Sequence, residues 1–72
     1  MNDIDCKPRV FVIDSKGQVG VIHGRDGDTP RRIVVRYGSG GPYRFHSHLD
    51  LRPATRSEVE VAGLDGVSGR YL

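Results

Sequence analysis

Short runs of β-branched and apolar residues, separated by glycine- and aspartate-rich segments, occupy the first 54 positions of the chain. Runs of this length and composition predict strands, at residues 9–13, 18–23, 32–37, 43–46 and 51–52. The intervening segments are typical of turns, and Gly17 is suited to a positive φ. Residues 47–50 are too few for an α-helix but sufficient for one 3₁₀ turn. The pattern therefore predicts an all-β domain of five short strands.

Alternation along these strands predicts which side chains face the core. In 32–37, Ile33, Val35 and Tyr37 form one face, and Arg32, Val34 and Arg36 form the other. In 43–46, we expect the aromatic side chains on the core face and Arg44 and His46 on the outward face. Gly20 lies in mid-strand, which predicts close approach of a neighbouring backbone or aromatic ring. The expected core consists of Val10, Val12, Ile22, Ile33, Val35, Phe45, Leu49 and Leu51.

Four strands, a 3₁₀ turn and a short fifth strand follow one another in an order that resembles SH3-like barrels. Residues 8–37 resemble the KOW-type and Tudor-like branch of that fold, because an apolar strand leads through Gly17 into the G-x-V-like segment Gly20-Val21-Ile22 and then into an alternating strand. Residues 43–51 resemble the closing strand, the turn and the last strand. The resemblance covers about residues 8–54. It implies a small five-stranded SH3-like barrel, and it also implies RNA, nucleoprotein or peptide ligands, although one fold hosts many functions.

The chain accordingly divides into an N-terminal arm (1–7), the barrel (8–54) and a C-terminal extension (55–72). Thr55-Arg56-Ser57-Glu58 fits a capping box that begins a short helix, yet residues 58–61 also alternate as a strand would, so both alternatives stay open. Beyond Gly63 no period remains, and we expect a mobile tail unless its apolar residues dock on a partner. Cys6, near a terminus expected to be frayed, is interpreted as a structural or irrelevant residue without a functional role.

Composition excludes several classes of protein. The chain of 72 residues is 36% hydrophobic and holds a single cysteine, so a disulfide framework is excluded. The apolar runs are too short to span a bilayer, and the acidic N-terminus lacks the apolar region of a secretory signal, so a cytoplasmic protein is expected. A domain of this size leaves no room for a buried cofactor and would gain stability from assembly into a homo-oligomer.

Charge is segregated along the chain. Acidic residues exceed basic ones in residues 1–6 and 57–72, whereas ten of the eleven basic residues lie in 7–56. Most of these are arginines, which bind phosphate or carboxylate in bidentate fashion. An outward arginine stripe with His23 beside it predicts a nucleic-acid-binding face. Its candidate residues are Arg25, Arg31, Arg32, Arg36, Arg44 and His46.

The alternative is a protein-interaction or self-assembly module, such as a phage- or plasmid-type accessory protein. In that case Phe11, Ile13 and the tail would form the interface, and the arginines would be a solvated surface.

Catalytic and metal-dependent functions find little support in the sequence. His46-Ser47-His48 straddles a strand-to-turn junction, where two imidazoles need not converge on a metal, so no metal site is expected. Type II dihydrofolate reductases resemble this chain in barrel and length. Their V-Q-I-Y motif, however, corresponds to Tyr43-Arg44-Phe45-His46, which lacks the glutamine and the final tyrosine. The glycine-rich segment 38–42 predicts a hairpin connection. We therefore expect a binding module that is not an enzyme and that uses no cofactor.

Overall fold

The computed structural model describes residues 1–38 and 40–72, and in these it contains five strands, one α-helix and two 3₁₀ turns. The strands are β1 (Phe11–Asp14), β2 (Val19–Arg25), β3 (Arg32–Arg36), β4 (Tyr43–Ser47) and β5 (Leu51–Pro53). The 3₁₀ turns are η1 (Asp3–Asp5) and η2 (His48–Asp50), and the helix is α1 (Arg56–Val61). The all-β prediction, with a 3₁₀ turn before a short last strand, is confirmed.

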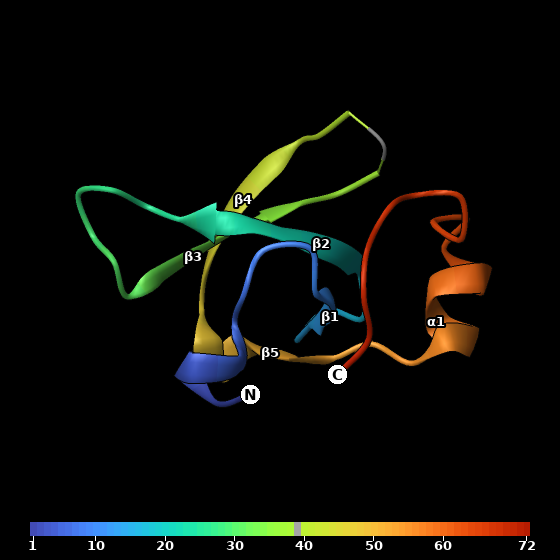
Figure 1. Cartoon of the computed structure of the whole chain (residues 1–72), viewed down its shortest axis with the longest axis horizontal. Coiled ribbons are helices and arrows are strands. Elements are labelled where there is room, and N and C mark those ends of the chain that lie inside the picture. Colours follow the sequence, from blue (N-terminus) through green and yellow to red (C-terminus); the bar gives the residue numbers. More distant parts are fainter. Residues whose placement is uncertain (39) are drawn as a thin grey trace.

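All strands pair antiparallel in one sheet, in the order β4-β3-β2-β1-β5 (Figure 1). The short strand β5 returns to β1 after η2, and this arrangement is compatible with an SH3-like fold. The predicted connection between β3 and β4 includes Ser39, which lies outside the described residues.

The inner face of the sheet encloses the first apolar core. Six of the eight residues expected in the core are buried there: Val10, Val12, Ile22, Ile33, Val35 and Leu51. The expectation was wrong for Phe45 and Leu49, which are 56% and 78% exposed. Phe45 lies directly opposite Val34, so it belongs to the outer face of the sheet, and Leu49 lies on η2, whose three residues are all outside the core.

The N-terminal arm completes this core. Cys6 is only 2% exposed and packs within the inner cluster, so it is a structural residue, and the expected fraying of the terminus was wrong at this position. Its burial raises the pKa of the thiol. The terminal amine donates a hydrogen bond to Leu51 O (2.9 Å), and His48 Nδ1 donates one to Met1 O (2.7 Å). These bonds hold the arm against the end of the sheet.

Gly20 marks the tightest contact between neighbouring strands. A Cβ atom at this position would lie 2.6 Å from Val35 Cγ1 and 2.9 Å from Arg36 O, with the Tyr37 ring at 3.2 Å. Real side chains do not approach so closely, so β2 passes β3 only because it has no side chain here. The predicted reason for a glycine in mid-strand is confirmed.

The C-terminal extension covers part of the outer face of the sheet. Phe11 and Ile13, which the protein-interaction alternative placed in an interface, are 2% and 7% exposed because a second core, with Val59 and Leu64, packs over them. In Figure 1 the orange and red segment lies beside β1 and the start of β2.

The last residues also bond to the sheet, where a mobile tail was expected. Arg70 pairs with Val10 in an isolated parallel bridge, and its amide donates to Arg9 O at 2.8 Å. The Tyr71 ring lies 5.0 Å from the Phe11 ring, between centroids. The apolar residues of the tail therefore dock on their own chain.

Helix α1 begins at the predicted capping box. Thr55 Oγ1 accepts a hydrogen bond from Glu58 N (3.2 Å), and Glu58 Oε1 accepts one from Thr55 N (2.9 Å). Arg52 also holds the Glu58 carboxylate, at 2.7 Å for the shorter contact. The hydrogen bond from Arg52, followed by that from the Thr55 backbone, lowers the pKa of Glu58 to about 2. The helix alternative for residues 58–61 is thus the one the chain adopts.

Val35 tests the inner core. Val35→Ala should lower the free energy of unfolding by about 1–3 kcal/mol, because it empties part of a site that is 0% exposed. Val61→Ala is the control at a 90% exposed position and should change stability by no more than about 0.5 kcal/mol. Urea unfolding of the three proteins measures both values. Equal effects of the two substitutions would contradict the assigned face of β3.

Gly69 tests the docking of the tail. A Cβ atom there would lie 2.5 Å from Phe11 Cζ and 3.0 Å from Arg9 O, whereas one at Gly66 would meet nothing within 4 Å. Gly69→Ala should therefore destabilise the fold by about 1–3 kcal/mol through overpacking. Gly66→Ala should stay within about 0.5 kcal/mol of wild type in the same unfolding assay. A neutral Gly69→Ala would mean that the tail does not pack on Phe11.

Candidate nucleic-acid interface

The outer face of the β3–β4 hairpin is left uncovered by the C-terminal extension. Residues directly opposite each other in antiparallel strands project to the same side of the sheet. Arg36 is opposite Tyr43, and Val34 is opposite Phe45. Arg32 lies on the same side two residues before Val34. The predicted outward positions of Arg32 and Arg36 are thus confirmed, and two aromatic residues join them.

The predicted orientation of β4 was wrong. Arg44 is opposite Val35 and His46 is opposite Ile33, so both project to the inner side of the sheet. Arg44 therefore does not share a face with Arg32 and Arg36. The physical reason is that β4 is the last strand in the sheet order, beyond the fully buried Ile33 and Val35 of β3. Among the described residues, no core lies beside β4 for its aromatic side chains, and the register of the hairpin places them on the outer face of the sheet.

Aromatic and basic side chains contact each other on the uncovered face. The Arg32 guanidinium lies over the Phe45 ring, 5.4 Å from its centroid. His23, at the irregularity in the β2–β3 register, meets the Tyr43 ring edge-on with centroids 5.0 Å apart. Tyr43 is 51% exposed and Phe45 is 56% exposed. We call this surface, made of Arg32, Val34, Tyr43 and Phe45 with His23 and Arg36 at its edge, the aromatic–arginine face.

Acidic side chains neutralise little of this face. Asp26 approaches Arg32 at 3.8 Å, a long contact that leaves half of the Arg32 side chain exposed. Arg36 is half-buried, and it makes no ion pair with any residue in 1–38 or 40–72. An exposed pair such as Arg32–Asp26 contributes little and is screened by salt. Positive charge therefore remains available beside the two rings.

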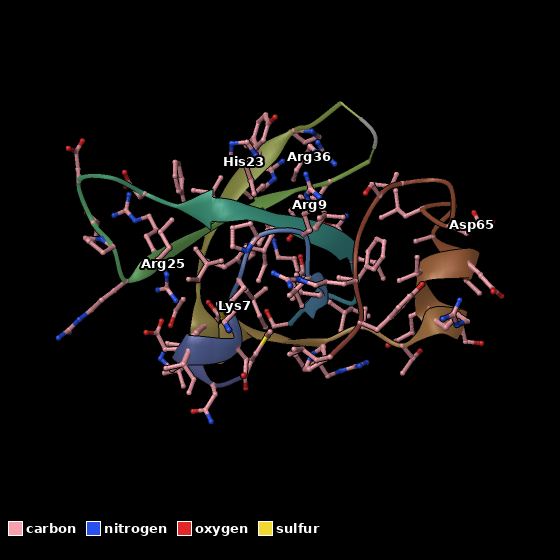
Figure 2. All side chains as sticks on the ribbon, viewed as in Figure 1. Lys7, Arg9, His23, Arg25, Arg36 and Asp65 are labelled. Atoms are coloured by element: carbon pink, nitrogen blue, oxygen red, sulfur yellow. The ribbon has the colours of Figure 1, made fainter. Side chains whose placement is uncertain are left out.

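Arg25 lies apart from this face. Arg25 is opposite Ile33, and Figure 2 shows it toward the N-terminal arm. It donates to Asp3 Oδ1 (2.8 Å), Asp3 O (2.7 Å) and Pro30 O (3.0 Å). The hydrogen bond from Arg25 lowers the pKa of the Asp3 carboxyl. Arg31 is exposed just before β3. Arg25 thus fastens the arm to the β2–β3 loop.

His46 belongs to a partly buried polar network. The Tyr37 hydroxyl donates to Asp14 Oδ2 at 2.7 Å and lies 2.8 Å from His46 Nε2. Because its proton points to the carboxylate, its oxygen accepts from His46 Nε2–H. Asp14, at the end of β1, also accepts from the Lys16 and Gln18 amides, both at 2.9 Å. This network joins β1 to the β3–β4 hairpin.

The network shifts two pKa values. Burial alone would raise the pKa of Asp14, but the hydrogen bonds from Gln18, Tyr37 and Lys16 outweigh it and hold this pKa below its ordinary value. Burial and the bond to Asp14 raise the pKa of the Tyr37 hydroxyl above its ordinary range. The hydroxyl therefore stays protonated as the donor that the ionised carboxylate needs.

The sequence identified the arginines but missed the two aromatic residues, because large apolar side chains were assigned to the core. Arg9, which lies beside this face, was also missed. His46 and His48 contact different groups, and among the described residues no three His, Cys, Asp or Glu side chains gather as metal ligands. None of the described helical segments has the length and apolar character needed to span a bilayer.

Comparison with known proteins adds no relative: the chain matches no protein-family model, no curated protein and no solved structure.

The Asp14 network predicts a pH-dependent loss of stability. Tyr37→Phe should cost about 1–2 kcal/mol near neutral pH, since it leaves a buried carboxylate with one donor fewer. Because the pKa of Asp14 in the folded protein lies below its ordinary value of 3.8, ionised Asp14 stabilises the fold at pH values above 3.8. This stabilisation is lost as the pH falls through the pKa of Asp14 in the folded protein. The difference between variant and wild type should therefore shrink as the pH falls below about 4.

Chemical unfolding at pH 7, 5 and 3 measures this difference. Tyr43→Phe is the matched control. The Tyr43 ring is exposed, and its hydroxyl makes no hydrogen bond to any described residue. A Tyr37→Phe deficit that is equally large at every pH would show that the carboxylate is not involved.

Proposed function

We propose that this domain binds single-stranded nucleic acid on the aromatic–arginine face. The observation that carries the proposal is the pair of half-exposed rings, Tyr43 and Phe45, beside arginines on one side of the hairpin. Single-strand-binding proteins combine basic side chains for the phosphates with aromatic rings for the bases. The face offers both in adjacent positions.

The arrangement favours a single strand over a duplex. Tyr43 and Phe45 are two residues apart on one strand, so they are separated by roughly 6.7 Å. This is about twice the rise of roughly 3.4 Å between neighbouring nucleotides in a duplex strand. Bases resting on both rings are therefore spread apart, which an unpaired strand allows and a duplex does not. Each base stacked on an aromatic ring contributes about 1–3 kcal/mol.

The resemblance to KOW-type domains is consistent with an RNA ligand, because such domains commonly bind RNA or ribosomal components. It rests on strand order and on the Gly17 and Gly20 positions rather than on binding residues. The choice between RNA and DNA follows from contacts to the 2′-hydroxyl, which the binding assay compares directly.

The alternative proposal is a protein-interaction module, and the surface first expected for it is not exposed. Phe11 and Ile13 are covered by the chain itself. A protein partner would have to use the aromatic–arginine face, and its binding would depend weakly on salt if the rings dominated.

Binding should be measured by fluorescence anisotropy with RNA and DNA strands about eight nucleotides long. Phe45→Ala and Tyr43→Ala should each weaken binding by about 1–3 kcal/mol with little loss of stability, because both rings are half-exposed. Arg32→Gln should lower the slope of log affinity against log salt by about 0.7. Arg44→Gln, on the neighbouring strand β4 and on the opposite side of the sheet, is the matched control for Arg32→Gln.

Wild-type protein that binds no single strand even at low salt would contradict the proposal. So would equal effects of Arg32→Gln and Arg44→Gln, since those would indicate attraction by overall charge alone. Size-exclusion chromatography with light scattering, with and without the oligonucleotide, then reports whether the domain associates with itself instead.

A further inference from the structure

A hollow beside the aromatic–arginine face is lined by several basic side chains. It has a volume of about 310 Å³ and is lined by Arg9, His23, Arg36 and Ser68 over Val21 and Ile22. A second hollow of about 410 Å³ adjoins it, shares Arg9 and Ser68, and adds Gly69 and Arg70. We call the two together the arginine hollow. Figure 2 shows its labelled members Arg9, His23 and Arg36 around β2 and the hairpin.

The arginines of this hollow are not neutralised by the chain. None of Arg9, Arg36 and Arg70 is within ion-pair distance of a carboxylate in the described part of the protein. Arg36 Nε is buried, and no described group accepts a hydrogen bond from it. Native proteins satisfy nearly all such buried donors, because leaving one unpaired costs about as much as the group's desolvation. No carboxylate is among the described lining residues either.

Arg9 is held in an unusual backbone conformation at the rim. Its φ is +74°, in the left-handed region that residues other than glycine rarely adopt. The surroundings fix this conformation, because Arg9 N donates to Ile22 O (2.7 Å) and Arg9 O accepts from Arg70 N (2.8 Å). Strained positions that the structure enforces in this way cluster at ligand sites. The tail, which supplies Ser68 and Arg70, thereby completes the hollow.

We propose that the arginine hollow binds a phosphate monoester, as the terminal phosphate of a nucleic-acid strand or as a free nucleotide. A monoester carries more charge than an internal phosphodiester and has three terminal oxygens. The guanidinium groups of Arg9 and Arg36 suit these oxygens, and the Ser68 hydroxyl and His23 imidazole supply further polar groups.

The position of the hollow connects it to the stacking rings. Arg36 lines the hollow and is directly opposite Tyr43, and His23 lines the hollow and contacts the Tyr43 ring. A strand whose end phosphate lies in the hollow therefore has its next bases beside Tyr43 and Phe45. This source of the phosphate rests on the proposed function, whereas binding of a free nucleotide does not.

The test compares oligonucleotides of one sequence that end in 5′-phosphate, 3′-phosphate or hydroxyl groups. Either the 5′-phosphorylated or the 3′-phosphorylated strand should bind about tenfold or more tightly than the strand with hydroxyl ends. The reason is that its terminal phosphate accepts charge-assisted hydrogen bonds in a partly enclosed site. Arg9→Gln should remove this increase and leave the affinity for the hydroxyl-ended strand nearly unchanged. Arg56→Gln, an exposed arginine on α1, is the matched control and should keep the increase.

Nuclear magnetic resonance with nucleoside monophosphate and with inorganic phosphate gives an independent readout. Both should shift the amide signals of His23, Arg36 and Ser68 in the wild type, and Arg9→Gln should abolish these shifts. Identical affinities for all ends, with no shifts, would overturn the inference while Phe45-dependent binding of the hydroxyl-ended strand would still support the proposed function. Shifts with the monophosphate, without binding of any strand, would support the hollow and overturn the proposed function.

Discussion

The sheet has two apolar faces, and the inner face is buried more completely than the outer face, where Tyr43 and Phe45 stay exposed. The inner face closes on itself around Ile33 and Val35, with the N-terminal arm filling its open end. The outer face depends on the last 18 residues, which pack on Phe11 and stop short of the β3–β4 hairpin. Small domains bury a low fraction of their surface, so an uncovered remnant is expected. Here the remnant is where the aromatic and basic side chains gather.

The register of one hairpin decides what that remnant contains. Because side chains alternate with a period of two, a shift by one residue would exchange Phe45 for Arg44 on the outer face. The pairing of Val34 with Phe45 turns the rings outward and leaves Arg44 on the inner side. The surface therefore presents exposed rings with arginines beside them. Under the proposed function, unpaired bases would stack on these rings, which a purely electrostatic stripe could not offer.

Local chemistry was readable from the sequence, and long-range packing was not. The alternation around Val35, the capping box at Thr55 and the close approach at Gly20 each depend on neighbours in sequence or on an adjacent strand. The burial of Cys6 and the docking of the tail depend on contacts between segments distant along the chain, for which no periodic signal exists. The outward rings of β4 were missed because hydrophobicity predicts burial only where a core is available.

Segregation of charge along the chain becomes segregation of charge in space. The acidic segments at both ends of the chain fold back on the basic centre, where Asp3 forms an ion pair with Arg25 and Glu58 forms one with Arg52. Asp26 makes only a long contact with Arg32, at 3.8 Å. The arginines left without such a partner among the described residues include Arg9 and Arg36, which line one hollow next to the exposed rings. A net charge of only +2 thus leaves a concentrated positive region, because none of the described acidic side chains lines this hollow.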